Sequence, residues 1–114
     1  MTKEKTEQKN LNIEMEAIEQ QLIEGINGTI KEINEKTNLE YYGVDTYNTR
    51  KGVEIIVLLD QGEEISEWYS TEVDPRGLKQ SNIYKFKLKY GKYPEVGMSI
   101  KAILNEEGFF RIDK

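Results

Sequence analysis

Cysteine and histidine are both absent from this 114-residue chain. Their absence excludes disulfides, thiolate nucleophiles, imidazole bases and the nitrogen and sulfur ligands that zinc prefers. Carboxylates are present but scattered, and none of them share the spacing of a metal or acid–base motif. The four aspartates, which are Asp45, Asp60, Asp74 and Asp113, are best interpreted as turn or edge residues. The sequence therefore predicts a protein that is not an enzyme and uses neither a metal nor a small-molecule cofactor.

Long apolar runs are also missing, and no basic segment precedes a short apolar one. We therefore expect neither a membrane span nor a secretory signal, and no membrane partner. A chain of this length is enough for one domain with a single modest core. The expectation is one soluble, intracellular domain over residues 11–114, cytoplasmic or in the host cytoplasm if viral. Residues 1–10 are almost wholly polar and are expected to form a disordered tail.

Positive charge is scarce in the chain as a whole, which has a formal net charge of −5, but it is concentrated near the end. Between residues 76 and 101, seven cations stand against the single acid Glu95. They are Arg76, Lys79, Lys85, Lys87, Lys89, Lys92 and Lys101. Such segregation is greater than solubility requires, and it indicates a polyanionic partner.

Residues 81–90 lie within this cationic stretch and fit two secondary structures. As a strand, their aromatic and aliphatic side chains alternate with lysines at period two. As a helix, Ser81 is a good N-cap, Gly91 suits the left-handed residue after the last turn, and Pro94 prevents continuation. We favour the helix, because it gives the chain a coherent order of elements.

The region before the sheet predicts an amphipathic helix over residues 11–24. Its apolar positions recur at three- or four-residue steps, at Leu11, Met15, Ile18 and Leu22. Gly25 and the Asn27-Gly28 pair end it. Residues 29–33 fit either a resumed helix or a first short strand. The apolar stripe of the helix would pack on the protein's own sheet, cover an open barrel end, or pair with a second copy.

The rest of the chain predicts β-strands. We expect them over residues 41–48, 53–59, 63–70, 98–104 and 109–112, separated by glycine- and aspartate-containing turns. With a helix at 81–90, the order is three strands, a helix and two strands, which is that of an OB barrel. The predicted fold class is therefore mainly β (α+β): an OB-like five- or six-stranded antiparallel barrel over about residues 28–113, with an N-terminal helix.

The final third of the chain carries a recognisable set of residues. A serine-led lysine and aromatic segment ends in Tyr90-Gly91, Pro94 follows, Val96-Gly97-Met98 opens the fourth strand, and Gly108-Phe109 opens the fifth. This part resembles small OB-fold single-stranded nucleic-acid-binding proteins of archaea, phages and viruses. The resemblance implies a non-catalytic binder of single-stranded DNA or RNA that holds phosphates with lysine and stacks bases on aromatics. The acidic balance of the chain and its lack of an arginine- and glycine-rich tail depart from that pattern.

Single strands are held by cations that follow the phosphates and by aromatic faces on which bases stack. The candidates for phosphate contacts are Arg76, Lys79, Lys85, Lys89, Lys92 and Arg111, and those for base stacking are Tyr47, Trp68 and Phe109. Phe109 and Arg111 share parity on the last strand and therefore face the same side. Each of these residue types is also common on an ordinary protein surface or at the rim of a core. The hypothesis therefore depends on their occurring together.

Acidic residues close to Trp68 oppose this interpretation. Glu64, Glu67 and Glu72 would repel phosphate unless they face away from the binding surface. The alternative is a protein-interaction or structural module that forms a homodimer or docks through its N-terminal helix, with acidic and basic faces in contact. A carboxylate-dependent nuclease is a more distant hypothesis.

Overall fold

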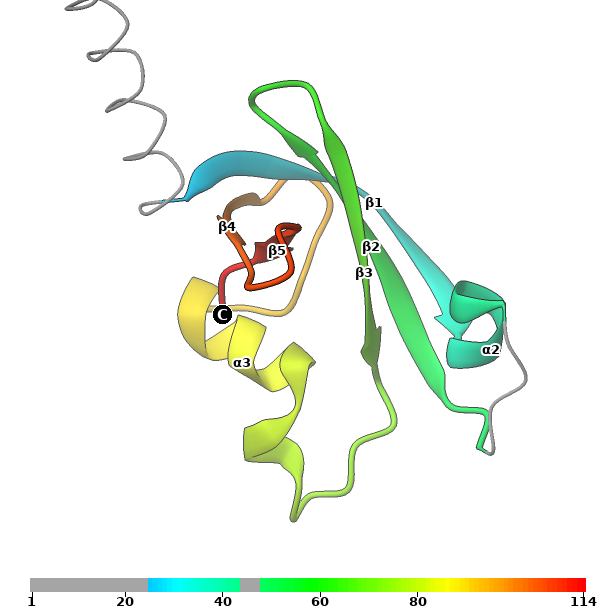
Figure 1. The fold of residues 1–114 in the computed structure, drawn as a ribbon. Coiled ribbons are helices and arrows are strands. Elements are labelled where there is room, and N and C mark those ends of the chain that lie inside the picture. Colours follow the sequence, from blue (N-terminus) through cyan, green and yellow to red (C-terminus); the bar gives the residue numbers. More distant parts are fainter. Residues whose placement is uncertain (1–24, 44–47) are drawn as a thin grey trace, which may run out of the picture.

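The computed structural model describes residues 25–43 and 48–114 (Figure 1). The predicted tail 1–10, the predicted helix 11–24 and the candidate Tyr47 lie outside the described residues. The strands are β1 (Ile26–Thr37), β2 (Lys51–Leu59), β3 (Glu64–Ser70), β4 (Ser99–Leu104) and β5 (Phe110–Ile112). The helices are α2 (Asn38–Tyr42), the 3-10 turn η1 (Leu78–Gln80) and α3 (Asn82–Tyr90). In the described part of the chain, no helix is long and apolar enough to cross a membrane.

The five strands form one antiparallel sheet in the order β3-β2-β1-β4-β5. The central strand β1 pairs with β2 from Gly28 to Thr37 and with β4 from Ile26 to Thr29. A register irregularity between Ile30 and Glu32 bends β1 between these two partners. Figure 1 shows β1 curving over the β4–β5 hairpin. The bend brings the two edge strands, β3 and β5, toward each other, so that the sheet is nearly closed into a barrel.

The helix predicted over residues 81–90 is confirmed as α3. Ser81 Oγ accepts a hydrogen bond from Tyr84 N at 3.3 Å, as an N-cap should. At the other end Gly91 has φ +85°, and its N–H donates to Lys87 O at 2.8 Å. Phe86 faces inward and is fully buried, so the strand interpretation of this segment is wrong.

The prediction of a first strand over residues 41–48 is wrong in its described part. Residues up to Tyr42 belong to α2, which starts with a capping box: Glu40 N donates to Thr37 Oγ1 at 3.2 Å, and Thr37 N donates to Glu40 Oε1 at 3.1 Å. The first strand is β1, so residues 29–33 open the sheet and do not resume a helix. The other four strands are confirmed to within two residues at each end.

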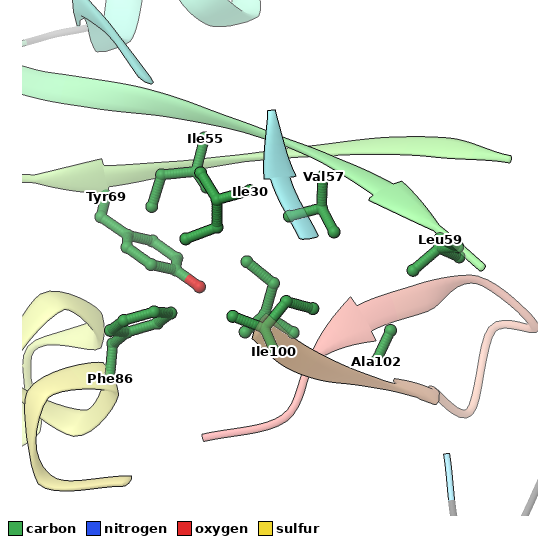
Figure 2. Close-up of a cluster of buried hydrophobic side chains, with 9 residues drawn as sticks. Ile30, Ile55, Val57, Leu59, Tyr69, Phe86, Ile100 and Ala102 are labelled. Atoms are coloured by element: carbon green, nitrogen blue, oxygen red, sulfur yellow. The ribbon is translucent and has the colours of Figure 1, made fainter. Parts of the chain in front are cut away.

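The core lies on the inner face of the barrel. Its buried apolar residues are Ile30, Ile55, Val57, Leu59, Tyr69, Phe86, Ile100, Ala102 and Ile112 (Figure 2). Three of them alternate along β2, whereas the intervening Leu58 is exposed. The apolar run in β2 therefore lies in the interior of the sheet, between β3 and β1, with its alternate side chains buried in the core. At one end of the core the Phe86 ring lies 6.5 Å from that of Tyr69, which joins α3 to β3.

Candidate nucleic-acid interface

The two edge strands of the sheet meet at a seam. β3 pairs with β2 and β5 pairs with β4, and a side chain connects the two edges: Glu67 Oε2 on β3 accepts from Ile112 N on β5 at 2.5 Å. Glu67 is 8% exposed, and among the described residues it is the one buried charged side chain. Its other carboxylate oxygen lies 3.3 Å from Tyr69 Oη and 3.4 Å from Lys114 Nζ. The Glu67 carboxylate therefore connects β3 with β5 at this point of the seam.

Three adjoining hollows follow this seam. One of about 390 Å³ lies between the start of β3 and residues 108–111, and it includes Phe109 and Arg111. The next, of about 350 Å³, lies between Trp68 and Arg111. The third, of about 450 Å³, lies between Trp68 and residues 72–82. The first two share Arg111, and the last two share Tyr42, Trp68 and Asn82, so we treat the three as one surface, the seam cleft.

Trp68 is held firmly on one wall of the seam cleft. Its indole N–H donates to Lys36 O at 2.8 Å, so the ring reaches from β3 across β2 to β1. It crosses β2 at Gly52, where an added Cβ would lie 2.3 Å from Trp68 Cζ2. Glycine is required there because of this close approach. The side chain remains half-buried, so part of its surface is still open to solvent.

Two tyrosines of α2 extend the aromatic wall. The Tyr42 ring lies 6.2 Å from the Trp68 ring, and Tyr41 lies 4.9 Å from Tyr42, both in edge-to-face geometry. Tyr41 Oη is 2.8 Å from Ser66 Oγ on β3, which fixes α2 against the sheet. Tyr42 is 58% exposed and therefore offers a ring face to a ligand.

The opposite wall carries cations. Arg111 is exposed on β5, and Lys114 lies beyond the end of that strand; both line the hollow that faces Trp68. Lys114 Nζ also lies 5.3 Å from the centre of the Tyr69 ring. Burial, and then the neighbouring Glu67 charge, raises the pKa of the Tyr69 phenol, which therefore stays neutral. This hollow thus joins aromatic rings to two cations, of which Lys114 is paired with Glu67.

Two of the three acids expected to repel phosphate are neutralised. Glu64 Oε1 lies 2.6 Å from Lys31 Nζ, and this hydrogen bond and charge raise the pKa of Lys31. Glu67 points into the barrel and pairs with Lys114. Glu72 remains exposed beside the third hollow.

The predicted site residues divide into two groups. Trp68, Phe109 and Arg111 line the seam cleft, and Phe109 is 60% exposed at its end. The other described candidates lie on the surface of the loop after β3, η1, α3 and the loop that follows α3, and none lines a hollow of the cleft: Arg76, Lys79, Lys85, Lys89 and Lys92.

Several of those surface cations already have acidic neighbours. Lys89 Nζ is 2.9 Å from Asp113, and this hydrogen bond and charge raise the pKa of Lys89. Lys92 Nζ is 2.9 Å from Glu95, and Arg76 Nε is 3.9 Å from Asp74. Lys79 and Lys85 form no ion pair with any described residue. The cationic stretch of the sequence is therefore less uniformly available than its composition indicates.

Sequence reasoning missed Tyr41, Tyr42, Asn82 and Lys114 as lining residues of the cleft. The Thr37-x-x-Glu40 capping box was the signal that would have placed the two tyrosines on a short helix. No comparable signal marks Asn82 or Lys114, since their place depends on how the chain packs.

Within the described part of the chain, no group of three or more acidic residues is arranged to hold a metal ion. The seam cleft offers a ligand aromatic faces, the amide of Asn82 and three cations. It is also lined by five acids: Glu63, Glu64, Glu67, Glu72 and Asp74. Comparison of the chain with protein-family models, with curated proteins and with solved structures finds no match.

Proposed function

We propose that the protein is a non-catalytic binder of single-stranded DNA or RNA, built on an OB-like barrel, with the seam cleft as its site. The strand order and the position of α3 between β3 and β4 support the OB-like assignment. OB barrels bind oligonucleotides on the face of strands two and three, between the first and the last interstrand loops. The seam cleft borders that region: β3 lines all three of its hollows and β2 lines none, with Tyr42 before β2 at one boundary and Phe109 before β5 at the other.

One observation carries the proposal: the rings of Tyr42 and Trp68 line one hollow with Arg111, which forms no ion pair with a described residue, and with Lys114, whose charge is paired with Glu67. Cations attract the phosphate chain, and each base stacked on a ring contributes about 1 to 3 kcal/mol. An extended strand lying between the walls would make both contacts at once. The inward turn of Glu67 and the pairing of Glu64 reduce the repulsion that the acidic composition predicts.

The test is binding of fluorescently labelled single strands, DNA and RNA, at low ionic strength, measured by anisotropy. We expect Tyr42→Ala to weaken binding by about 5- to 160-fold, the loss of one stacked base. Tyr93→Ala is the matched control, because Tyr93 is also exposed but lines no hollow of the cleft. Equal affinity of the two variants would place the site elsewhere, and no binding of the wild-type protein to any single strand would refute the function.

A protein-interaction module is the second candidate. Leu88 on α3 and Val96 in the following loop are 66% and 63% exposed, high values for aliphatic side chains of this size. Light scattering of the intact chain and of a chain that starts at residue 25 discriminates between the candidates. A dimer that becomes a monomer on truncation would favour the module, and a monomer in both cases would count against dimerisation.

A further inference from the structure

The seam cleft divides at the start of α3. Asn82 lines both the hollow beside Arg111 and the hollow that extends past Trp68 toward residues 72–82. A strand longer than the cleft therefore has two ways to continue beyond Asn82: over the loop that follows β3, or along α3.

The path over the loop has more acids than cations. Glu72 and Asp74 line that hollow and are exposed, and the one cation in its lining is the exposed Arg50. The nearby Arg76 offsets them weakly, because its guanidinium lies 3.9 Å from Asp74 and is almost fully solvated. Phosphates that moved in this direction would meet like charge.

The path along α3 is cationic. Lys85 is three residues beyond Asn82 and therefore lies on the same face, about 4.5 Å further along the helix axis. It is exposed and forms no ion pair with a described residue. Lys89 continues this face one turn later, where it is paired with Asp113. Lys87 lies about 200° around the helix from Lys85, with its ammonium 4.7 Å from the centre of the Tyr93 ring.

We propose that a bound single strand leaves the seam cleft at Asn82 and continues along the Lys85 face of α3, where Lys85 contacts a phosphate. This inference rests on the proposed function and extends it to strands that are longer than the cleft. It assigns Lys85, but not Lys87, to the binding surface, in keeping with the helical spacing of the two lysines.

The experiment compares Lys85→Glu with Lys87→Glu, which make the same charge change on opposite faces of one helix. Affinity is measured for oligothymidylates of about 4 and about 12 nucleotides, within the site sizes of single OB folds. For the longer strand we expect Lys85→Glu to weaken binding at least threefold more than Lys87→Glu. For the shorter strand the two variants should bind alike. Circular dichroism checks that both variants fold.

Two results would overturn the inference while the proposed function stands. In the first, both variants lose equal affinity for the longer strand, which would mean that only net charge matters. In the second, Lys85→Glu weakens the shorter strand as much as the longer one, which would place Lys85 inside the cleft. Failure of the wild-type protein to bind either length would instead remove the proposed function, and this inference with it.

Discussion

At the scale of single residues, Tyr69 shows how a buried polar group adjusts to a barrel core. Its ring packs among apolar side chains (Figure 2), while its hydroxyl group lies 3.3 Å from the buried carboxylate of Glu67. Both burial and that negative charge disfavour the phenolate form, which is why the pKa of Tyr69 is raised. The hydroxyl must therefore act as the donor in this pair.

This shift predicts alkaline sensitivity. A tyrosine in the unfolded chain ionises near pH 10, whereas Tyr69 in the folded protein keeps its proton. The unfolded state then binds fewer protons, so the free energy of unfolding falls as the pH rises above about 10. In Tyr69→Phe the free energy of unfolding should fall less as the pH rises above about 10, although this variant is less stable at neutral pH. Urea unfolding at pH 8 and pH 11 measures both slopes, and identical slopes would contradict the explanation.

At the scale of elements, the barrel depends on a side-chain connection between β3 and β5. Glu67→Ala would leave the buried Ile112 N–H without its partner, which costs about 1 to 3 kcal/mol, and would release Lys114 as well. Glu64→Ala is the control on the same strand, because Glu64 makes an exposed ion pair and should matter far less. Urea denaturation measures both variants. Equal loss of stability would show that the Glu67 connection does not hold the seam.

The elements that the sequence predicted well are those with local signals. Ser81, Gly91 and Pro94 bound α3 correctly because caps act within one turn of the chain, and turn glycines such as Gly62 and Gly108 placed the later strands. The first strand was misplaced because tyrosines favour strands by propensity, whereas the Thr37–Glu40 capping box starts a helix there. The two hydrogen bonds of the capping box therefore outweigh the strand propensity of the tyrosines.

The candidate site was predicted only in part, for a related reason. Strand parity placed Phe109 and Arg111 on one side of β5, and both line the seam cleft. Periodicity does not reveal which acids are paired: the contacts of Glu64 with Lys31 and of Glu67 with Ile112 and Lys114 join residues more than thirty positions apart. Periodicity also does not show that Lys89 is ion-paired whereas Lys85, on the same face, forms no ion pair with a described residue. These features depend on the closed sheet.

At the scale of the whole molecule, the proposed function requires an acidic chain to bind a polyanion. The formal net charge of −5 disfavours long-range attraction of a nucleic acid, so the proposed binding would depend on the local geometry of the seam cleft. Phosphate contacts release counterions, and log affinity for a single strand falls by about 0.7 per contact for each unit of log salt. Because the seam cleft offers few phosphate contacts, we expect the affinity to depend only modestly on salt. Base stacking should then contribute a large part of the binding free energy.

Trp68 is the single tryptophan of the chain, and it stands in the middle of the seam cleft. Its intrinsic fluorescence therefore reports directly on the proposed site. We expect single-stranded oligonucleotides to quench this emission saturably at low ionic strength, and added salt to reverse the quenching only in part. Unchanged Trp68 emission throughout a titration in which the strand is shown to bind by anisotropy, or no binding at all, would contradict the account.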